Sequence, residues 1–330
     1  MSPARSQPAP HACDAGAYEY VPPAPSVTVS DDSSGVVTGE SFHFTASVAG
    51  SAGITPAGKV TWILTGPGSP TCSASTLSPA GVGTCVVSHP QTGTYTAIAT
   101  YSGDINYNGG ATGSDKSAAV GKASSKAILS ISASSVVYGH EQTLKFSASV
   151  RPQFSGIPTG SVNVREGTRT LCEFALSAGK GSCSMPASAS ALLPVATYSV
   201  AAAYGGSADF KPSATSVLRF AVTKATSKTS LALSSPSVVY GHEQTLRFSI
   251  NVNPQFSGIP TGTVTIEVNK KRVCSIIVAA SSKGKGSCSP TATAVAVGTY
   301  KNSVIALFDG NTAFAGSVSS PATLMITKPT

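Results

Sequence analysis

Apolar and polar residues alternate along several short stretches of this chain. In the best-defined stretch, residues 143–150, every second side chain is apolar and the residues between are Lys, Ser or Thr. Two further stretches keep this rhythm, and the three apolar sets are Phe42, Phe44, Ala46 and Val48; Leu144, Phe146, Ala148 and Val150; and Leu246, Phe248, Ile250 and Val252. A period of two turns one face of a β-strand toward a core and the other toward water. No window keeps helical spacing for more than a turn or two, so the pattern predicts an all-β protein of antiparallel sheets.

A longer repeat contains this alternating strand. The segment VVYGHEQTLKFSASVRPQFSGIPTG at residues 136–160 returns as VVYGHEQTLRFSINVNPQFSGIPTG at residues 238–262, and a fainter copy begins at Gly35. The two near-copies lie 102 residues apart, so one repeat is about that long and the chain holds three. We therefore expect three domains, domain 1 over residues 25–122, domain 2 over residues 123–224 and domain 3 over residues 225–330. Residues 1–24 are expected to be a disordered or remnant tail with a Pro-rich spacer.

Shorter motifs recur in each repeat in the same order. YGHEQTL or its counterpart opens the alternating strand, PTGSV leads into the next, and Gly-Thr-Tyr or Ala-Thr-Tyr opens a later one, at Tyr95, Tyr198 and Tyr300. Together with YSGDINY at residues 101–107, these motifs resemble the bacterial immunoglobulin-like domains of group 3, from about residue 26 to residue 327. The resemblance implies three tandem immunoglobulin-like antiparallel β-sandwiches, with Trp62 in a core and each tyrosine hydroxyl tied back to the backbone. It also implies secreted or surface-exposed spacer and adhesion modules.

Charge is sparse and unevenly distributed. Charged residues make up 11% of the chain, which suits half-buried strands, and the net charge is +8. Domain 1 carries three basic and five acidic residues, domain 2 nine and four, and domain 3 nine and three. The basic excess favours anionic glycans or cell-wall polymers as partners, with an ordinary solvated surface as the alternative. Nucleic acid is not an expected partner, because no recognition motif accompanies the charge.

Six of the seven cysteines fall in pairs, one pair in each domain. The pairs are Cys72 with Cys85, Cys172 with Cys183, and Cys274 with Cys288. Their similar spacing places each pair on adjacent antiparallel strands joined by a short turn, within disulfide reach, with Cys13 left unpaired. Reduced structural thiols are the alternative, and zinc is disfavoured because no further His or Cys has metal-ligand spacing. Disulfides imply an oxidising compartment.

The first residues bear on localisation. MSPARSQPAPHACDAG lacks the apolar core of a signal peptide, and the chain has no run of 18 apolar residues, so no membrane insertion is expected. Residues 13–20, Cys-Asp-Ala-Gly-Ala-Tyr-Glu-Tyr, resemble the closing motif of bacterial surface proteins built on a parallel β-helix. We therefore expect an extracellular or cell-surface piece of a longer protein, with its signal peptide and further domains upstream.

Motifs that would carry chemistry are scarce. His140-Glu141 and His242-Glu243 suit acid–base or metal chemistry in principle, but they fall at a turn where polar residues are needed. Asp104, Asp209 and Asp309 are expected to stabilise the turn that follows the Tyr-opened strand. A calcium site in domain 1 would require Asp104 to gather Asp31, Asp32, Glu40 and Asp115. No nucleophile elbow, zinc-protease motif or phosphate-binding loop occurs, so we expect no enzyme activity, no cofactor and no metal.

Five cations of domain 3 form the candidate binding site. They are Lys270, Lys271 and Arg272, with Lys283 and Lys285, which the cysteine pair is expected to crowd onto one hairpin. Crowded like charges repel, and a polyanion would relieve that repulsion. An ordinary solvated hairpin is the alternative.

The sequence thus predicts a non-enzymatic secreted or cell-surface repeat protein that acts as a spacer or adhesive stalk. The alternative is a glycan- or cell-wall-binding accessory module of a larger β-helix exoprotein that acts on polysaccharides.

Overall fold

A computed structural model describes residues 21–51, 53–188 and 191–330. Cys13 and the motif at residues 13–20 lie outside the described residues. The chain divides into two compact units, Met1–Ala123 with Phe154–Gly156, and Ser124–Gln153 with Ile157–Thr330. Among the described residues, no helix is long and apolar enough to cross a membrane.

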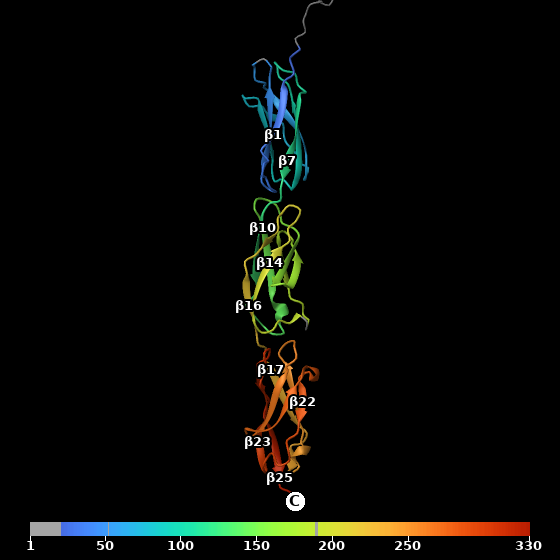
Figure 1. Cartoon of the computed structure of the whole chain (residues 1–330), viewed down its shortest axis with the longest axis vertical. Coiled ribbons are helices and arrows are strands. Elements are labelled where there is room, and N and C mark those ends of the chain that lie inside the picture. The colour runs from blue at the N-terminus through green and yellow to red at the C-terminus, as the bar shows by residue number, and fades with distance from the viewer. Residues whose placement is uncertain (1–20, 52, 189–190) are drawn as a thin grey trace, which may run out of the picture. The chain divides into compact units, whose positions relative to one another are not determined.

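The first unit is a two-layer sandwich of antiparallel strands (Figure 1). One sheet has the order β1-β2-β5 and the other the order β4-β3-β6-β7. The strands are β1 (Ser26–Asp31), β2 (Phe42–Ala49), β3 (Lys59–Thr65), β4 (Ser75–Thr76), β5 (Val82–Val87), β6 (Gly93–Tyr101) and β7 (Thr112–Val120). Asn108 ties the expected spacer to this sandwich, because its side-chain and backbone N–H groups donate to the carbonyls of Pro22 and Pro23.

The second unit holds two more sandwiches. In domain 2 the sheets are β13-β10-β8 and β12-β11-β14-β16-β9, with β15 beside β14. Its elements are β8 (Ser125–Ile131), β9 (Ser135–Val137), η1 (Glu141–Thr143), β10 (Lys145–Pro152), β11 (Ser161–Glu166), β12 (Arg169–Ala175), β13 (Lys180–Ser184), β14 (Thr197–Tyr204), β15 (Ser213–Ala214) and β16 (Leu218–Thr223).

Domain 3 repeats this arrangement, with sheets β17-β19-β22 and β18-β25-β23-β20-β21, and β24 beside β23. Its elements are β17 (Ser227–Leu233), β18 (Ser237–Val239), η3 (Glu243–Thr245), β19 (Phe248–Pro254), β20 (Gly262–Val268), β21 (Lys271–Val278), η4 (Ala280–Ser282), β22 (Lys285–Cys288), β23 (Gly298–Phe308), β24 (Ser317–Val318) and β25 (Ala322–Thr327).

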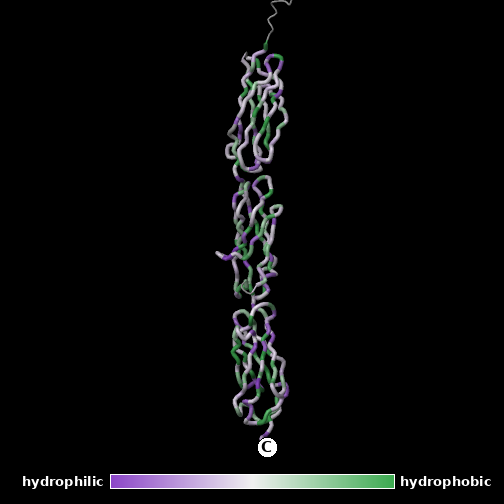
Figure 2. The backbone as a smooth tube through the Cα atoms, turned by 90° about the vertical axis from the view of Figure 1, so that its right-hand side faces the viewer, coloured by the Kyte–Doolittle hydropathy of each residue, from purple (hydrophilic) through white to green (hydrophobic). Residues whose placement is uncertain are grey.

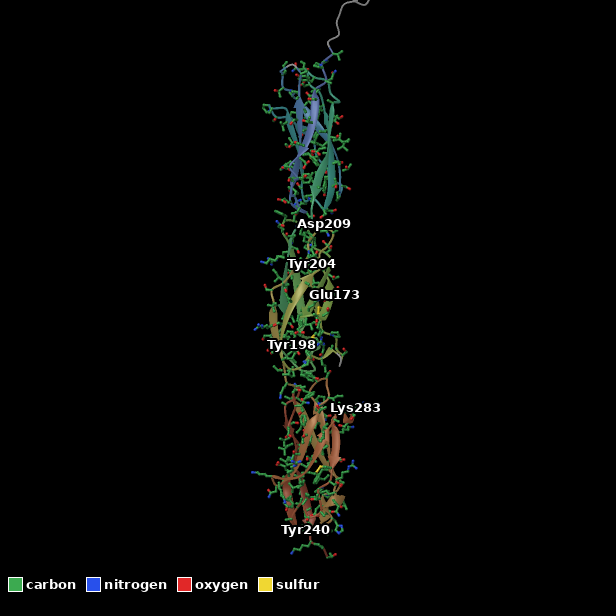
Figure 3. The ribbon with its side chains drawn as sticks, in the orientation of Figure 1. Glu173, Tyr198, Tyr204, Asp209, Tyr240 and Lys283 are labelled. Atoms are coloured by element: carbon green, nitrogen blue, oxygen red, sulfur yellow. A yellow bond between two sulfur atoms is a disulfide. The ribbon has the colours of Figure 1, made fainter. Side chains whose placement is uncertain are left out.

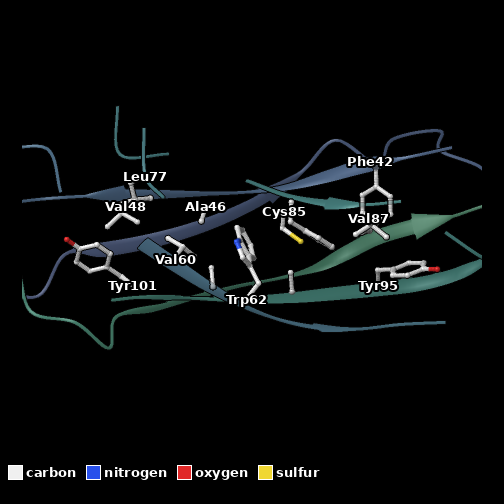
Figure 4. Close-up of a cluster of buried hydrophobic side chains, with 14 of the residues drawn as sticks. Phe42, Ala46, Val48, Val60, Trp62, Leu77, Cys85, Val87, Tyr95 and Tyr101 are labelled. Carbon is white, nitrogen blue, oxygen red and sulfur yellow. The ribbon is translucent and has the colours of Figure 1, made fainter. Parts of the chain in front are cut away.

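The cores are built from the alternating residues, as the sequence predicts. All twelve side chains of the three apolar sets are at most 5% exposed. In Figure 2, hydrophobic stretches of the tube (green) are interrupted throughout by paler and purple ones. In domain 1 the core also contains Trp62 (Figure 4). Its indole N–H donates to Ser75 Oγ at 3.1 Å. The all-β class and the sandwich architecture are therefore confirmed.

The three tyrosine corners are also confirmed. The hydroxyls of Tyr95, Tyr198 and Tyr300 each reach the carbonyl four residues earlier in the chain, at 3.1, 2.7 and 3.0 Å. Tyr95 makes the fullest set, because its oxygen also accepts the backbone N–H of Gln91 at 2.8 Å and lies 3.2 Å from the carbonyl of Pro67. Each corner fixes the loop that precedes the long strand.

A short parallel pair closes each sandwich. The last strand of domain 2, β16, pairs in parallel with β9, and in domain 3 β25 pairs in the same way with β18. Domain 1 has the equivalent bridge between Val37 and Gly121. We call this pairing the terminal clasp. It attaches the end of each domain to a segment near its beginning.

The corners yield a stability prediction. We expect Tyr95→Phe to cost about 1–3 kcal/mol, because it removes the acceptor of the Gln91 N–H as well as a hydroxyl donor, and Tyr198→Phe to cost only about 0.5–1.5 kcal/mol. Urea denaturation with hydrogen exchange read separately for amides of domains 1 and 2 measures both. Equal losses in the two variants would contradict this reading of the Tyr95 contacts.

Candidate functional site

Each sandwich contains one disulfide, and the three pairings are those predicted. Cys72–Cys85, Cys172–Cys183 and Cys274–Cys288 have Cα–Cα distances of 5.8, 6.1 and 6.2 Å. The expected location within one sheet is wrong, however. Cys172 lies on β12 and Cys183 on β13, which are edge strands of opposite sheets, and Cys274 and Cys288 lie on β21 and β22 in the same manner. Each bond in domains 2 and 3 therefore links the two layers of its sandwich.

The five cations of domain 3 are all exposed, but they do not crowd one turn. Lys270 occupies the turn from β20 to β21, while Lys283 and Lys285 follow η4 beyond the far end of β21. An eight-residue strand separates the groups, which at about 3.3 Å per residue is roughly 25 Å. Figure 3 shows Lys283 at the opposite end of domain 3 from Tyr240. The predicted single cluster is therefore wrong, and Lys270, Lys271 and Arg272 form a smaller group of their own.

This smaller group, which we call the cationic turn, lies beside a pocket of about 280 Å³. Val268, Asn269, Lys271 and Tyr300 contribute to its walls. Asn269 and Lys270 both have positive φ, 47° and 65°, as a tight two-residue hairpin turn requires. Within the described chain, no ion pair involves any of the three cations.

The neighbouring hydrogen bonds show which cation has a structural task. Lys271 Nζ donates to the carbonyl of Ala294 at 3.2 Å, and Arg169 of domain 2 donates to Ala191 at 3.3 Å from the matching strand position. Lys271 therefore supports the loop before β23 as Arg169 supports the loop before β14. Arg272 contacts Ser275 Oγ, whereas the side chain of Lys270 makes no hydrogen bond to the residues that the structure describes.

The aspartates considered for calcium have other partners. Asp104 accepts the backbone N–H groups of Ala57, Asn106 and Tyr107 at 2.6–2.7 Å. The Ala57 hydrogen bond is the largest cause that lowers the pKa of the Asp104 carboxyl. Asp32 accepts from His43, whose backbone hydrogen bond lowers the pKa of that carboxyl. In the part of the chain that the structure describes, no three His, Cys, Asp or Glu side chains gather closely enough to hold a metal ion.

In domains 2 and 3, residues other than Asp209 and Asp309 make the hydrogen bonds that Asp104 makes to Asn106 and Tyr107 in domain 1. The side chains that accept two successive backbone N–H groups in domains 2 and 3 belong to Ser207 and Asn311. A short oxygen-bearing side chain is what this turn requires, and Asp, Ser and Asn all provide one.

The glutamates of the two His-Glu pairs are buried, which the sequence did not predict. Glu141 is 2% exposed and Glu243 is 0% exposed. Glu243 Oε2 accepts the backbone N–H of Gly241 at 2.8 Å and that of Thr293 at 2.9 Å. The carboxylate thus holds the YGH turn against the loop that also receives the Lys271 hydrogen bond. A glutamate follows this turn in all three repeats, at Glu40, Glu141 and Glu243, and this repetition was the sequence signal of a structural role.

Comparison with known proteins places the chain in a family. Residues 129–223 and 231–327 match the bacterial Ig-like domain (group 3), and the chain belongs to that family. The chain matches no curated protein.

Several solved structures are similar at low sequence identity. A tetra-tandem repeat from the extending region of a large adhesion protein is 14% identical with a TM-score of 0.43, over 91% of this chain and 74% of that one. Invasin, a bacterial integrin-binding protein, is 10% identical with a TM-score of 0.43, over 92% and 60%. The Escherichia coli adhesin FdeC is 14% identical with a TM-score of 0.30, over 92% and 96%.

The buried glutamate can be tested by paired substitutions. Glu243→Ala leaves two backbone N–H groups without their acceptor and should destabilise domain 3 by roughly 1–3 kcal/mol for each. Glu243→Gln keeps a carbonyl oxygen at the same place and should cost less. Chemical denaturation followed on domain 3 compares the two, with Glu267→Ala as the control. Equal losses in the Gln and Ala variants would show that the acceptor oxygen is not what matters.

Proposed function

We propose that this chain is a non-enzymatic spacer of a secreted or cell-surface protein, and that its domains resist tension along the chain. Membership of the bacterial Ig-like family supports a repeat module. The three disulfides support an oxidising, extracellular location. The terminal clasp is the observation that supports resistance to tension.

The direction of the clasp decides how force acts on it. In domain 2 the chain enters at β8 and leaves after β16, and the parallel strands β9 and β16 both run toward the exit. Tension between the two ends pulls these strands past one another, so their hydrogen bonds are loaded together rather than opened one at a time. Those bonds include Ala221 N–H to the carbonyl of Ser134 at 2.9 Å and Tyr138 N–H to that of Thr223 at 2.8 Å.

Domain 3 repeats the arrangement with closely similar bonds. Met325 N–H donates to the carbonyl of Pro236 at 2.9 Å, and Tyr240 N–H donates to that of Thr327 at 2.9 Å. In domain 1, Thr38 and Gly121 make the corresponding bonds, each at 2.9 Å. A clasp of this kind in every domain is what a spacer under tension requires.

The clasp can be tested by single-molecule stretching of the full chain from its two ends. Ala221→Pro removes one clasp donor and should lower the unfolding force of domain 2, because forced unfolding follows the unfolding rate. The control is a core substitution, Val164→Ala, compared at matched loss of equilibrium stability. An unfolding force that falls as much in the core variant as in the clasp variant would contradict the role of the clasp.

The same experiment tests the disulfides. The bonded cysteines are 13, 11 and 14 residues apart. Reduction should therefore lengthen each unfolding event by roughly 35–50 Å, at about 3.3–3.6 Å per released residue. Unchanged event lengths after reduction would mean that the bonds are not formed in solution.

Polyanion binding by domain 3 is the second candidate function, favoured by the exposed cationic turn beside its pocket. Three cations on one turn suit an anionic glycan or wall polymer. This is also the role that a binding module of a larger β-helix exoprotein would require.

We expect retention of the chain on heparin to fall steeply with salt, since the screening length shortens to about 8 Å at physiological ionic strength. Replacing Lys270, Lys271 and Arg272 by Ser should abolish retention. Replacing Lys283 and Lys285 by Ser, at the other end of the strand, should leave most of it. Equal effects of the two variants would indicate net charge rather than a site at the cationic turn.

A further inference from the structure

Within the second unit, domains 2 and 3 contact one another through segments of the repeated sequence. The Tyr-Gly-His turn at residues 138–140 lies against the Phe-Ser-Gly loop at residues 256–258. The ring of His140 stacks on Phe256 with centroids 4.0 Å apart and planes 7° apart. Tyr138 packs edge-on against Phe314 at 5.4 Å. Ser257 N–H donates to the carbonyl of Gly139 at 3.3 Å.

Two glycines make this close approach possible. A Cβ on Gly139 would lie 2.2 Å from the carbonyl oxygen of Ser257, and one on Gly258 would lie 2.9 Å from the Tyr138 ring. Real Cβ contacts are essentially never this short, so the glycines belong to the contact itself as well as to their turns. Gly139 also has a φ of 81°, which disfavours any other residue.

Domain 3 contains the same turn, formed by Tyr240, Gly241 and His242. The φ of Gly241 is 87°, but among the described residues no atom lies within 4 Å of the position that its Cβ would take. His242 is exposed and Gly241 is half-buried, whereas His140 is half-buried and Gly139 is buried. The turn of domain 3 therefore presents the same residues as that of domain 2, with more of their surface exposed.

This open turn is held in shape without a partner. Tyr240 N–H is fixed by the carbonyl of Thr327 in the terminal clasp, and Gly241 N–H is fixed by the buried Glu243 carboxylate. Domain 1 provides a contrast, because its turn has Thr38 in place of the tyrosine and lacks the histidine. There, within the first unit, Ser155 Oγ still donates to the carbonyl of Gly39 at 3.0 Å, while Phe154 remains 43% exposed.

We propose that the Tyr240-Gly241-His242 turn is a docking slot for a further domain of this repeat, presented in the same chain. The occupant must offer a Phe-Ser-Gly loop to His242 and Gly241, and an aromatic ring to Tyr240 in the place of Phe314. The Phe-Ser-Gly loop of domain 3 already contacts domain 2, and Ser155 of the other loop contacts Gly39. In a second intact copy of the chain, both Phe-Ser-Gly loops therefore already make contacts of their own. The proposal rests on this geometry and does not need the mechanical role.

The route of the chain supports attachment in the same chain. Lys224 follows β16 and leads at once to Ala225, whose N–H donates to the carbonyl of Ala313 at 3.0 Å and whose carbonyl accepts from Ala315 at 2.8 Å. Lys328 follows β25 in the same position relative to its clasp, because Thr327 pairs with Val239 as Thr223 pairs with Val137. A domain joined after Lys328 begins beside the slot.

Proton NMR of the histidine rings tests the proposal. An aromatic ring stacked on an imidazole shifts the imidazole protons upfield, so His140 should resonate upfield of His242 in the present chain. In an extended chain, residues 1–328 are followed by a second copy of residues 225–330 in which the copied histidine is replaced by Gln. The His242 signals should then move to the position of the His140 signals. Signals are assigned with His140→Gln and His242→Gln.

Two variants of the extended chain serve as controls. Phe256→Ala in the appended copy alone, and Gly241→Ala in the slot, should each return His242 to its position in the present chain. The proposal is overturned if His242 does not shift while the appended domain is folded, or if both controls leave the shift intact. A concentration-dependent shift of His242 in the present chain would also overturn it, because the occupant would then be a second molecule.

Discussion

The terminal clasp is the constraint on which most of this structure depends. A sandwich of two sheets has open strand edges, and the last strand of each domain must be tied to something before the next domain begins. Here it is tied in parallel to a short segment near the start of the same domain. In domains 2 and 3 this segment forms the outer edge of the larger sheet, beside the last strand. In domains 2 and 3 the clasp also fixes the backbone of the tyrosine that begins the following turn, because Tyr138 N–H and Tyr240 N–H donate to Thr223 and Thr327.

Around each clasp, the polar side chains hold loops rather than perform chemistry. The buried glutamate of domain 3 accepts two backbone N–H groups, the corner tyrosine reaches the carbonyl of Ala296, and Lys271 reaches that of Ala294. All of these contacts converge on the loop before β23. Both of these N–H groups bond to Oε2, and Oε1 of Glu243 is buried without a hydrogen-bond partner among the described residues. Burying such a group is costly, so its use here indicates that the shape of this end of the domain matters. This agrees with a surface built to meet another domain.

The sequence predicted the parts that depend on local pattern. The period of two identified the core of each sandwich, because a pleated strand buries alternate side chains whatever its partners are. The tyrosine corners followed from residues only four apart. The disulfide pairings were also correct. The spacing of two cysteines along the sequence, however, shows only that they can come close together and not whether their strands belong to the same sheet. A turn that stays within one sheet and a turn that crosses to the other both bring cysteines to about 6 Å, and here the turn crosses in domains 2 and 3.

Two of the failures, the cation cluster and the contact between domains, concern which end of a strand a residue occupies. Cys274 and Cys288 are bonded, so the turn between them lies near residue 281, and Lys270 to Arg272 must fall on the far side of Cys274. For the same reason, the pattern within one repeat predicts only an ordinary turn at Tyr-Gly-His. The turn has the same sequence in domains 2 and 3, and so does the Phe-Ser-Gly loop, which begins 16 residues after the tyrosine in both. Within one domain these two segments lie at opposite ends of the alternating strand, so they can meet only between successive domains. Repetition of both segments is therefore the sequence signal of a contact between repeats, and a pattern within a single repeat does not contain it.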